Sequence, residues 1–385
     1  MNVLRPNSAL PRNLPLGLQP TRPPSVRRAL HADTQRGLTL VELMISIAIG
    51  MLITFGMLLL IMNTSRGFKS QDDFARMQES GIVALSYIGD AIRLAGFYGI
   101  GNAATPVDAA VGAVTTTTDC GSAANPPGAN WALNAIAPLG GFSGLTPLNV
   151  NATLPCILAS NFQTGQILAL RLSTGDPLRD PNNDGNMVDA AFVANRIYVQ
   201  GNASGAILFR GTDYGTLRGA SQTRRVFGGA DAPIFEYQAY LFYIRPCSRP
   251  IAPPGCQATD DDGRPVPTLV RQELDGPNMV ERPLVQGIEL IDYLFGLDAD
   301  GDGVPDRYTA APVGGDWATV VVVRVSVLVR DSRATAGFDD TGKLYDLNGD
   351  GVPDFTCTAN LNCNFKRHVF TQTFQVRNVA QRRGA

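Results

Sequence analysis

The longest apolar stretch in the sequence covers residues 38–62, and Glu42 is its only charged side chain. At a rise of 1.5 Å per residue, this stretch would span about 37 Å as an α-helix, which is enough to cross a bilayer. A cleaved secretion signal has a shorter apolar core of about 7–15 residues, followed by a site of small residues. The pattern therefore predicts a retained transmembrane helix over residues 38–62.

A second periodic pattern follows over residues 63–99. Apolar or small side chains recur there every three or four residues, with polar and charged side chains between them, as in an amphipathic helix. The glycines within residues 96–101 predict the end of this helix. We therefore expect one long helix whose amphipathic half packs on a globular domain. The apolar stripe consists of Phe74, Met77, Gly81, Leu85, Ile88, Ile92 and Ala95.

Residues 100–385 are predicted to form a β-rich globular domain. Residues 102–160 show little periodicity and are rich in Ala, Thr, Gly, Asn and Pro, so we expect an irregular connection there. Alternation is clearest in residues 318–330, where valines from Val321 to Val329 face one way and predict a half-buried strand. The fold class is therefore α+β, a long N-terminal helix packed on an antiparallel β-sheet. The other candidate strands are residues 166–172, 192–200, 206–210, 234–245, 284–295 and 366–376.

Charge is distributed unevenly along a chain whose formal net charge is −2. Residues 1–37 contain several arginines and a single acidic side chain, Asp33. Basic flanks of a transmembrane helix stay in the cytoplasm, so we expect residues 1–37 inside and everything after residue 62 outside. The nearly neutral total charge and the lack of an RNA-binding aromatic motif argue against a nucleic-acid partner.

The histidine content limits the catalytic chemistry, because the sequence contains only His31 and His368. A zinc protease of the H-E-x-x-H type cannot be assembled from them. A Ser-His-Asp triad would have to use His368, which alternates with Phe370 along a candidate strand and is better explained as structural. We therefore expect that the protein is not an enzyme.

The residues at the start of the apolar stretch carry a family resemblance. The run R-G-L-T-L-V-E-L-M-I over residues 36–45 closely resembles the cleavage site of type IV prepilins and of type II secretion pseudopilins. The resemblance implies that a prepilin peptidase cuts after Gly37 and methylates the new N-terminus at Leu38, so that residues 1–37 are a leader peptide. It also implies that Glu42 pairs with the N-terminal amine of a neighbouring subunit during assembly. Such a pairing is physically reasonable because both groups are poorly solvated in lipid.

Within that family, the chain looks most like the PilW-type minor pilins, which are related to the J-type pseudopilins of type II secretion. The resemblance rests on the size, on L-A-G-F-Y-G at the predicted helix end and on V-x-V-R-V-S-V-L-V-R in the late strand. It implies a single-pass inner-membrane protein that is later inserted into a pilus at the cell surface, in a tip complex that primes assembly, for pilus assembly, twitching motility and adhesion. The implied partners are other minor and major pilins, the prepilin peptidase and the inner-membrane assembly platform, with a large pilus-tip adhesin as a further candidate. The alternatives are a J-type secretion pseudopilin and a calcium-dependent tip adhesin module.

All six cysteines follow the apolar stretch, on the oxidising side of the membrane, so disulfides are expected. Short loops favour pairing Cys247 with Cys256 and Cys357 with Cys363, which leaves Cys120 for Cys156. A tetrahedral zinc site would need more closely spaced pairs of the C-x₂₋₄-C type, which are absent from the sequence.

Two acidic windows share the pattern D-x-[DN]-x-D-G-x-P-D, one starting at residue 298 and one at residue 346. Oxygen ligands at positions 1, 3 and 5, a glycine at position 6 and a carboxylate at position 9 resemble the start of a calcium-binding loop. Position 12 is Thr309 or Cys357 instead of glutamate, so neither window is a complete EF-hand. The alternative is that these residues only form tight turns between strands.

We predict structural Ca²⁺ at these windows, where it would order the loops instead of taking part in catalysis. They resemble the short calcium loops of extracellular repeats and of pilus-tip proteins. A third stretch, from residue 180 to residue 189, fits less well because its last carboxylate is out of step. The candidate ligands are Asp298, Asp300, Asp302 and Asp306; Asp346, Asn348, Asp350 and Asp354; and, in the third stretch, Asp180, Asn182, Asp184 and Asp189.

Overall fold

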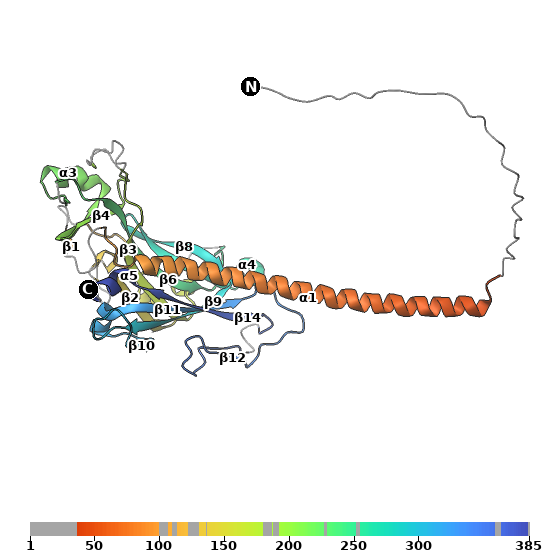
Figure 1. The fold of residues 1–385 in the computed structure, drawn as a ribbon. Helices are drawn as coiled ribbons and strands as arrows, with labels where there is room; N and C mark the ends of the chain where they lie inside the picture. The colour runs from red at the N-terminus through yellow and green to blue at the C-terminus, as the bar shows by residue number, and fades with distance from the viewer. Residues whose placement is uncertain are drawn as a thin grey trace, which may run out of the picture. The chain divides into compact units, whose positions relative to one another are not determined.

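The computed structural model describes most of the chain beyond residue 36. The described residues are 37–99, 107–109, 114–121, 131–135, 137–179, 187, 192–226, 229–251, 255–358 and 363–383. The chain divides into two compact units, residues 1–65 and 66–385, and each is described by itself. The second unit contains the sheets and the last turns of the long helix (Figure 1).

The long helix, α1, runs over Leu40–Leu94. It ends five residues before the expected boundary at residue 99, because the chain leaves the helix to pair with a strand. Ala95 forms an isolated antiparallel bridge with Leu172, and the N–H of Gly96 donates to the carbonyl of Arg171 at 2.9 Å. Gly96 has a φ of 74°, a left-handed conformation that glycine adopts easily at a helix end.

The smaller of the two main sheets has four antiparallel strands in the order β10-β9-β11-β14. Strand β11 is central and pairs along most of its length with both neighbours. The strands are β9 (Ile288–Leu297), β10 (Arg307–Thr309), β11 (Val320–Arg330) and β14 (Arg367–Gln375).

The larger sheet has eight strands, and its long strand β6 pairs with β4, β3 and β7. Among the described strand pairs, only β1 with β5 is parallel. The strands are β1 (Val107–Ala109), β2 (Leu139–Leu145), β3 (Gly165–Ser173), β4 (Ile197–Asn202), β5 (Gly205–Arg210), β6 (Ile234–Arg245), β7 (Thr268–Asp275) and β8 (Asn278–Gln286). The fold is thus a long apolar helix followed by an antiparallel β-sheet domain.

The main core lies where the amphipathic part of α1 meets the two sheets. Its buried side chains come from α1, from β3 and β6 of the large sheet, and from β9 and β11 of the small one. The predicted stripe supplies the helix side, with Leu85, Ile88 and Ile92 at most 4% exposed, whereas Phe74 at its start is 45% exposed. Helix and sheet approach closely at Gly81 and Gly89, which face phenylalanine rings of β14.

A second core covers the opposite face of the large sheet. Side chains from described residues within 114–162, among them Trp131 and Leu154, pack there on β3, β4 and β6. The segment of residues 102–160, expected to be a partly irregular connection, includes strand β2 and the short helix α2 (Val150–Thr153) among its described residues. The composition of this segment is typical of loops and did not predict that its side chains pack as a layer on the large sheet.

The described residues between β11 and β14, 331–358 and 363–366, form an excursion with a small hairpin of β12 (Leu344–Tyr345) and β13 (Phe355–Thr356). Tyr345 and Leu347 pack against Leu290 and Leu328 on the far face of the small sheet. The strand expected to be half-buried is therefore largely buried on both faces, and its valines from Val321 to Val329 lie in the main core.

Two expected strands differ from the structure by more than one or two residues at their ends. The candidate over residues 284–295 is split at Gly287, which has a φ of 83° and separates β8 of the large sheet from β9 of the small sheet. The candidate over residues 192–200 is a turn followed by β4, and the Tyr198 hydroxyl accepts the N–H of Val193 at 3.0 Å. The remaining helices are α3 (Tyr214–Gly219), α4 (Asp260–Gly263) and α5 (Arg377–Arg383).

Candidate functional site

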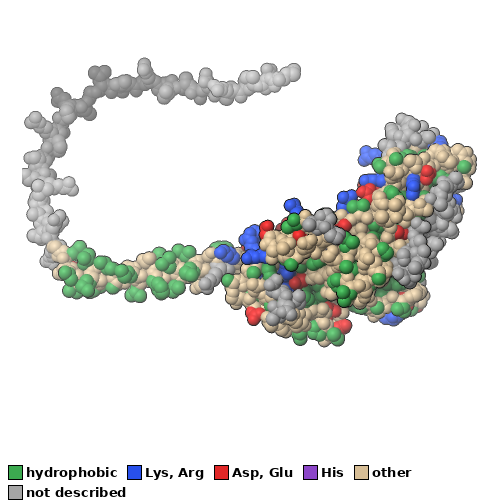
Figure 2. Space-filling view, turned by 180° about the vertical axis from the view of Figure 1, so that it is seen from behind, with side chains coloured by type: hydrophobic (Ala, Val, Ile, Leu, Met, Phe, Trp, Pro, Cys, Tyr) green, Lys and Arg blue, Asp and Glu red, His purple; other side chains and the backbone are tan. Residues whose placement is uncertain are grey.

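The apolar part of α1 presents hydrophobic side chains around the helix (Figure 2). Within the part of the chain that the structure describes, α1 is the one helix that is long and apolar enough to cross a membrane. No residue of its most apolar 18-residue segment is buried. Single exposed apolar residues are common on soluble proteins, but a continuous apolar surface needs a lipid or protein environment. Length, composition and exposure together favour a membrane helix.

The predicted processing site lies just before this helix. Gly37 and Leu38 are exposed and precede the first helical residue, Leu40. The peptide bond between them therefore lies in exposed, non-helical chain, as protease substrates generally do. Processing at this bond stays a prediction.

Glu42 lies in the first turn of α1 and forms a capping box with Thr39. The Glu42 N–H donates to the Thr39 hydroxyl at 3.2 Å, and the Thr39 N–H donates to the Glu42 carboxylate at 3.4 Å. The spacing T-x-x-E is the signature of this motif, but the sequence analysis considered Glu42 only for assembly. An ionised carboxylate has further acceptor sites, so the capping bonds leave Glu42 able to bind a second donor.

The first acidic loop connects β9 to β10. The buried carboxylate of Asp298 accepts the N–H groups of positions 4 and 6 at 2.6 and 3.1 Å. The carboxylates of Asp298, Asp300 and Asp306 offer oxygen atoms within 4.8 Å of one another, and Asp302 is exposed at the tip. Three of the four predicted ligands of the first loop thus lie close together. The hydrogen bonds from backbone N–H groups to Asp298 are also those of a tight turn.

The second acidic loop connects β12 to β13 and has the same internal hydrogen bonds. The Asp346 carboxylate accepts the N–H of Gly349, at position 4, at 2.5 Å and the N–H of Gly351, at position 6, at 2.9 Å. These two bonds lower the pKa of Asp346, and the bond from Gly351 contributes most. The Asn348 amide donates to the Asp354 carboxylate at 3.3 Å, and the Asp350 carboxylate accepts a backbone N–H at 2.7 Å. The equivalent glycines of both loops have φ between 78° and 87°: Gly301, Gly303, Gly349 and Gly351.

A buried carboxylate that the sequence analysis missed faces the second loop. Asp292 on β9 is 6% exposed; its Oδ1 accepts the Gln166 amide at 2.5 Å, whereas its Oδ2 has no hydrogen-bond partner. Burial raises the pKa of Asp292 to about 6, with a further contribution from the Asp354 carboxylate. A lone Asp inside the hydrophobic run I-E-L-I-D-Y-L-F was the signal available in the sequence.

The third candidate metal site, with Asp180, Asn182, Asp184 and Asp189, lies outside the described residues.

The cysteines form three disulfides in the pairs expected from the sequence: Cys120–Cys156, Cys247–Cys256 and Cys357–Cys363. The Cys120–Cys156 disulfide links two parts of the segment within residues 114–162 that covers the large sheet. Cys120 is fully buried in the second core. The last closes the chain just after β13, near the end of the excursion. All six thiols are bridged, so none is available as a thiolate ligand or nucleophile.

A buried ion-pair network ties the excursion to the small sheet. The Arg367 guanidinium, on β14, donates to both carboxylate oxygens of Glu289 on β9, at 2.5 and 3.1 Å, and to Asp340 at 3.2 Å. The Tyr345 hydroxyl donates to Asp340 at 2.7 Å, and Arg330 lies 3.6 Å from Glu289. The two cations and two anions balance, as buried charges must.

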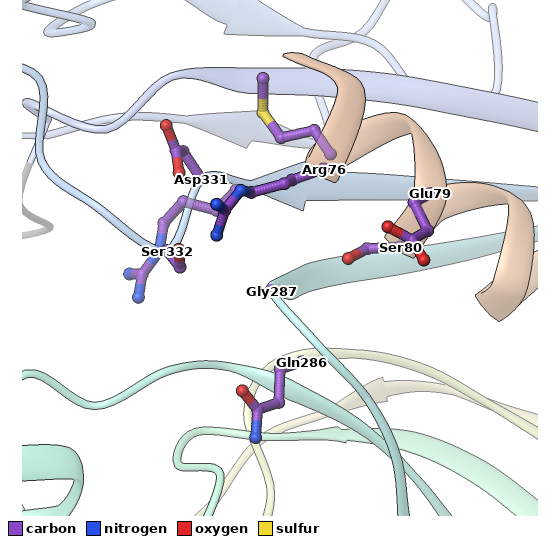
Figure 3. A pocket seen from close by; sticks show the side chains of 9 residues that line it. Arg76, Glu79, Ser80, Gln286, Gly287, Asp331 and Ser332 are labelled. Carbon is purple, nitrogen blue, oxygen red and sulfur yellow. The ribbon is translucent and has the colours of Figure 1, made fainter. Parts of the chain in front are cut away.

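A further cavity of about 230 Å³ lies between α1 and the chain around Gly287 (Figure 3). Arg76, Glu79 and Ser80 line it from the helix, and Asp331 lines it from the end of β11. Met77 of the apolar stripe also lines the cavity, whereas none of the predicted processing, assembly, metal or disulfide residues does. His368, the one histidine among the described residues, lies edge-on to Phe74 and Phe370, with ring centroids 5.4 and 4.7 Å away.

Comparison with known families defines the class of protein. Residues 33–58 match the prokaryotic N-terminal methylation motif, which here spans Gly37, Leu38 and Glu42. The chain therefore carries the N-terminus of a prepilin. Residues 257–378 match the family described as type IV pilus-assembly protein W, and this segment includes the small sheet and both acidic loops. The two matches indicate a type IV minor pilin of the PilW type, which takes part in pilus assembly, and both families are structural.

Among solved structures, a type IV-like pilin from Thermus thermophilus is similar to 48% of this chain and 83% of its own chain, with 8% sequence identity and a TM-score of 0.21. No curated protein sequence matches the chain significantly.

Proposed function

We propose that this protein is a minor pilin of the pilus tip, which primes assembly and then supports twitching motility and adhesion. The observation that carries the proposal is the prepilin motif on a fully exposed apolar helix, joined to a PilW-type segment in the same chain. Its role is structural, without substrate turnover. The similarity of residues 257–378 to type IV pilus-assembly protein W favours a pilus over a type II secretion pseudopilus, and deletion of the gene should abolish twitching instead of protein secretion.

The membrane helix sets the orientation in this proposal. The basic residues before Gly37 hold the N-terminus in the cytoplasm, and the globular unit of residues 66–385 lies outside. A unit of this size is bulky for a subunit repeated along a filament shaft, which supports a place at the tip. The partners are the other minor and major pilins, the prepilin peptidase and the assembly platform in the inner membrane.

Glu42 has two separable roles in this account, and a pair of variants distinguishes them. Glu42→Gln removes the charge but keeps a side chain that can complete the capping box with Thr39. Glu42→Ala removes both the charge and the cap, and loss of a cap costs about 1 kcal/mol of helix stability. Glu79→Ala, an exposed carboxylate outside the apolar stretch, serves as the matched control.

If the charge pairs with the amine of a neighbouring subunit, both Glu42 variants are made and processed but are depleted from sheared pili, and Glu79→Ala is incorporated normally. Immunoblots of sheared pili and of membranes measure this ratio. Normal incorporation of Glu42→Gln would show that Glu42 acts only as a helix cap, and the assembly role would be abandoned.

A further inference from the structure

Strand β14 forms one edge of the small sheet, and its outward backbone groups have no hydrogen-bond partner among the described residues. At the two ends of its ladder, the N–H of Val376 donates to the carbonyl of Val321 at 2.8 Å, and the N–H of Asp331 donates to the carbonyl of Lys366 at 2.9 Å. Because hydrogen-bonded pairs alternate along an antiparallel ladder, the even-numbered residues of β14 bond to β11 and the odd-numbered residues point outward. The free N–H and C=O groups in the middle of the strand belong to Val369, Thr371 and Thr373.

The other edge strands of the two main sheets have features that oppose pairing with another chain. Strands β1 and β10 have three residues each, β2 is interrupted by a register shift, and β8 contains Pro283 beside the charged Glu281 and Arg282. Natural proteins protect sheet edges in these ways. Strand β14 instead has nine residues in unbroken register with β11, and no proline, acid, lysine or arginine from His368 to Gln375. It is therefore a template for a further strand.

Partly exposed apolar side chains lie along the same edge. Phe74 of α1 is 45% exposed and lies edge-on to the ring of His368, at the start of β14, with ring centroids 5.4 Å apart. Val369 and Phe370 are only partly buried, one on each face of the strand. Side chains of neighbouring strands lie together on each face of a sheet, so a strand added to β14 would cover these groups. Backbone bonds and apolar contacts would thus both favour binding at this edge.

Strand β14 runs in the same direction as the segment of α1 that it packs on (Figure 1). Just before the strand, Lys366 donates to the Ser70 hydroxyl at 3.0 Å, whereas near its end the ring of Phe374 lies against Gly89. A two-fold dimer through antiparallel β14 strands would therefore point the two α1 segments in opposite directions. Copies that are anchored in one membrane by the same N-terminal helix cannot form it. A second copy could offer β10, which runs opposite to β14, but β10 has only three residues. This geometry favours a different protein as the partner.

We propose that the free edge of β14 binds an antiparallel, extended strand of a different pilin subunit, which continues the small sheet across the subunit boundary. Main-chain hydrogen bonds give such strand addition its affinity, and the alternate side chains of the added strand give it specificity. Because β14 carries no charge from Val369 to Gln375, we expect an uncharged partner strand. The identity of the partner rests on the proposed function as a pilin, whereas the free edge does not.

The test uses three variants of one exposed residue in the full-length protein, made in the native strain. The N–H of Thr373 points outward, so Thr373→Pro removes a donor from the free edge without removing a bond to β11. Thr373→Ala keeps that N–H and is the matched control. Thr373→Lys keeps every backbone bond and adds the charge by which natural edge strands resist pairing. Immunoblots give the ratio of protein in sheared pili to protein in membranes, and thermal unfolding in detergent gives the Tm of each variant.

We expect Thr373→Ala to enter pili like the wild type. Thr373→Pro should lower the ratio of pilus to membrane protein by about 10-fold, because it removes one main-chain bond and places a ring against the added strand. Its Tm should stay within about 2 °C of the wild type, since the change is confined to an exposed edge. Thr373→Lys should be depleted from pili as well. If Thr373→Pro lowers the Tm further, Thr373→Lys decides the matter.

Strand addition at β14 is refuted if the wild type enters pili and the folded Thr373→Pro and Thr373→Lys variants enter them equally well. The choice of a different subunit is refuted if the purified wild type forms dimers in sedimentation experiments that Thr373→Pro dissociates, because a second copy would then occupy the edge. Absence of the wild type from sheared pili would instead overturn the proposed function, and with it a pilin as the partner.

Discussion

The close approach of α1 to strand β14 makes the stability of the globular unit sensitive to one methyl group. A Cβ atom added at Gly89 would lie 2.1 Å from Cε1 and 2.5 Å from Cζ of Phe374, whose side chain is 2% exposed. Carbon atoms in ordinary contact are about 3.5–4.0 Å apart, so the overlap exceeds 1 Å. Because the ring is enclosed, Gly89→Ala must displace either the helix or the strand.

A matched substitution isolates the cost of this overlap. Gly67 is exposed in the same helix, and a Cβ atom added there meets nothing within 4 Å. Gly67→Ala should therefore stabilise the helix by up to about 1 kcal/mol through its higher helix propensity. Gly89→Ala has the same gain and an overpacking cost of about 1–3 kcal/mol. The difference between the two variants is thus the overpacking cost itself.

The assay is thermal or urea unfolding of the full-length protein in detergent, followed by tryptophan fluorescence. Both tryptophans, Trp131 and Trp317, lie in the globular unit and report its unfolding. We expect Gly89→Ala to unfold at least about 2–6 °C below Gly67→Ala. Phe374→Leu removes Cε1 and Cζ, so in the double variant much of the cost of Gly89→Ala should disappear. Equal stability of the two alanine variants would refute the described packing of α1 on β14.

Two further predictions concern the excursion and the covering segment. Glu289→Gln leaves the fully buried Arg367 side chain without its main counter-ion and should lower the free energy of unfolding in urea by about 3–5 kcal/mol. The control, Asp72→Asn, breaks the exposed ion pair with Arg76 and should change the free energy of unfolding by less than about 1 kcal/mol. If Glu289→Gln and Asp72→Asn changed the free energy of unfolding by similar amounts, the buried ion-pair network would not be formed. Replacing Cys120 and Cys156 by Ser opens a loop of 36 residues and should cost about 4 kcal/mol, against about 2 kcal/mol for the loop of 6 residues between Cys357 and Cys363. Calorimetric Tm values of the two double variants, compared with the wild type, check this order, and the reverse order would contradict the loop-entropy reasoning.

The strands that could be predicted from the sequence are those with one clear periodic signal. Strand β6 has the expected bounds, and β11 and β14 differ from expectation by one or two residues at their ends. Strand β7 was not predicted because Arg271 and Glu273 interrupt its apolar pattern. Their charges are accommodated by ion pairs, including one from Glu273 to Arg282 on the neighbouring strand. Pairing across strands is a tertiary feature that a single strand sequence does not contain.

The same limit applies to the candidate sites. The acidic windows repeat a local spacing and were identified from the sequence, and short loops suggested the cysteine pairs. Asp292 lies more than 50 residues before the loop that it faces, so only the folded sheet brings them together. The excursion that covers β11 likewise reverses the prediction of a half-buried strand, because burial of its second face depends on residues beyond its end.

The N-terminus of the mature protein is the feature that most directly distinguishes a processed minor pilin from an uncleaved membrane protein. Intact mass and N-terminal sequencing of the membrane-extracted protein, from cells with and without the prepilin peptidase, measure it. We predict a chain that begins with N-methylated Leu38 only when the peptidase is present. A chain that keeps residues 1–37 in both strains would contradict the minor-pilin account.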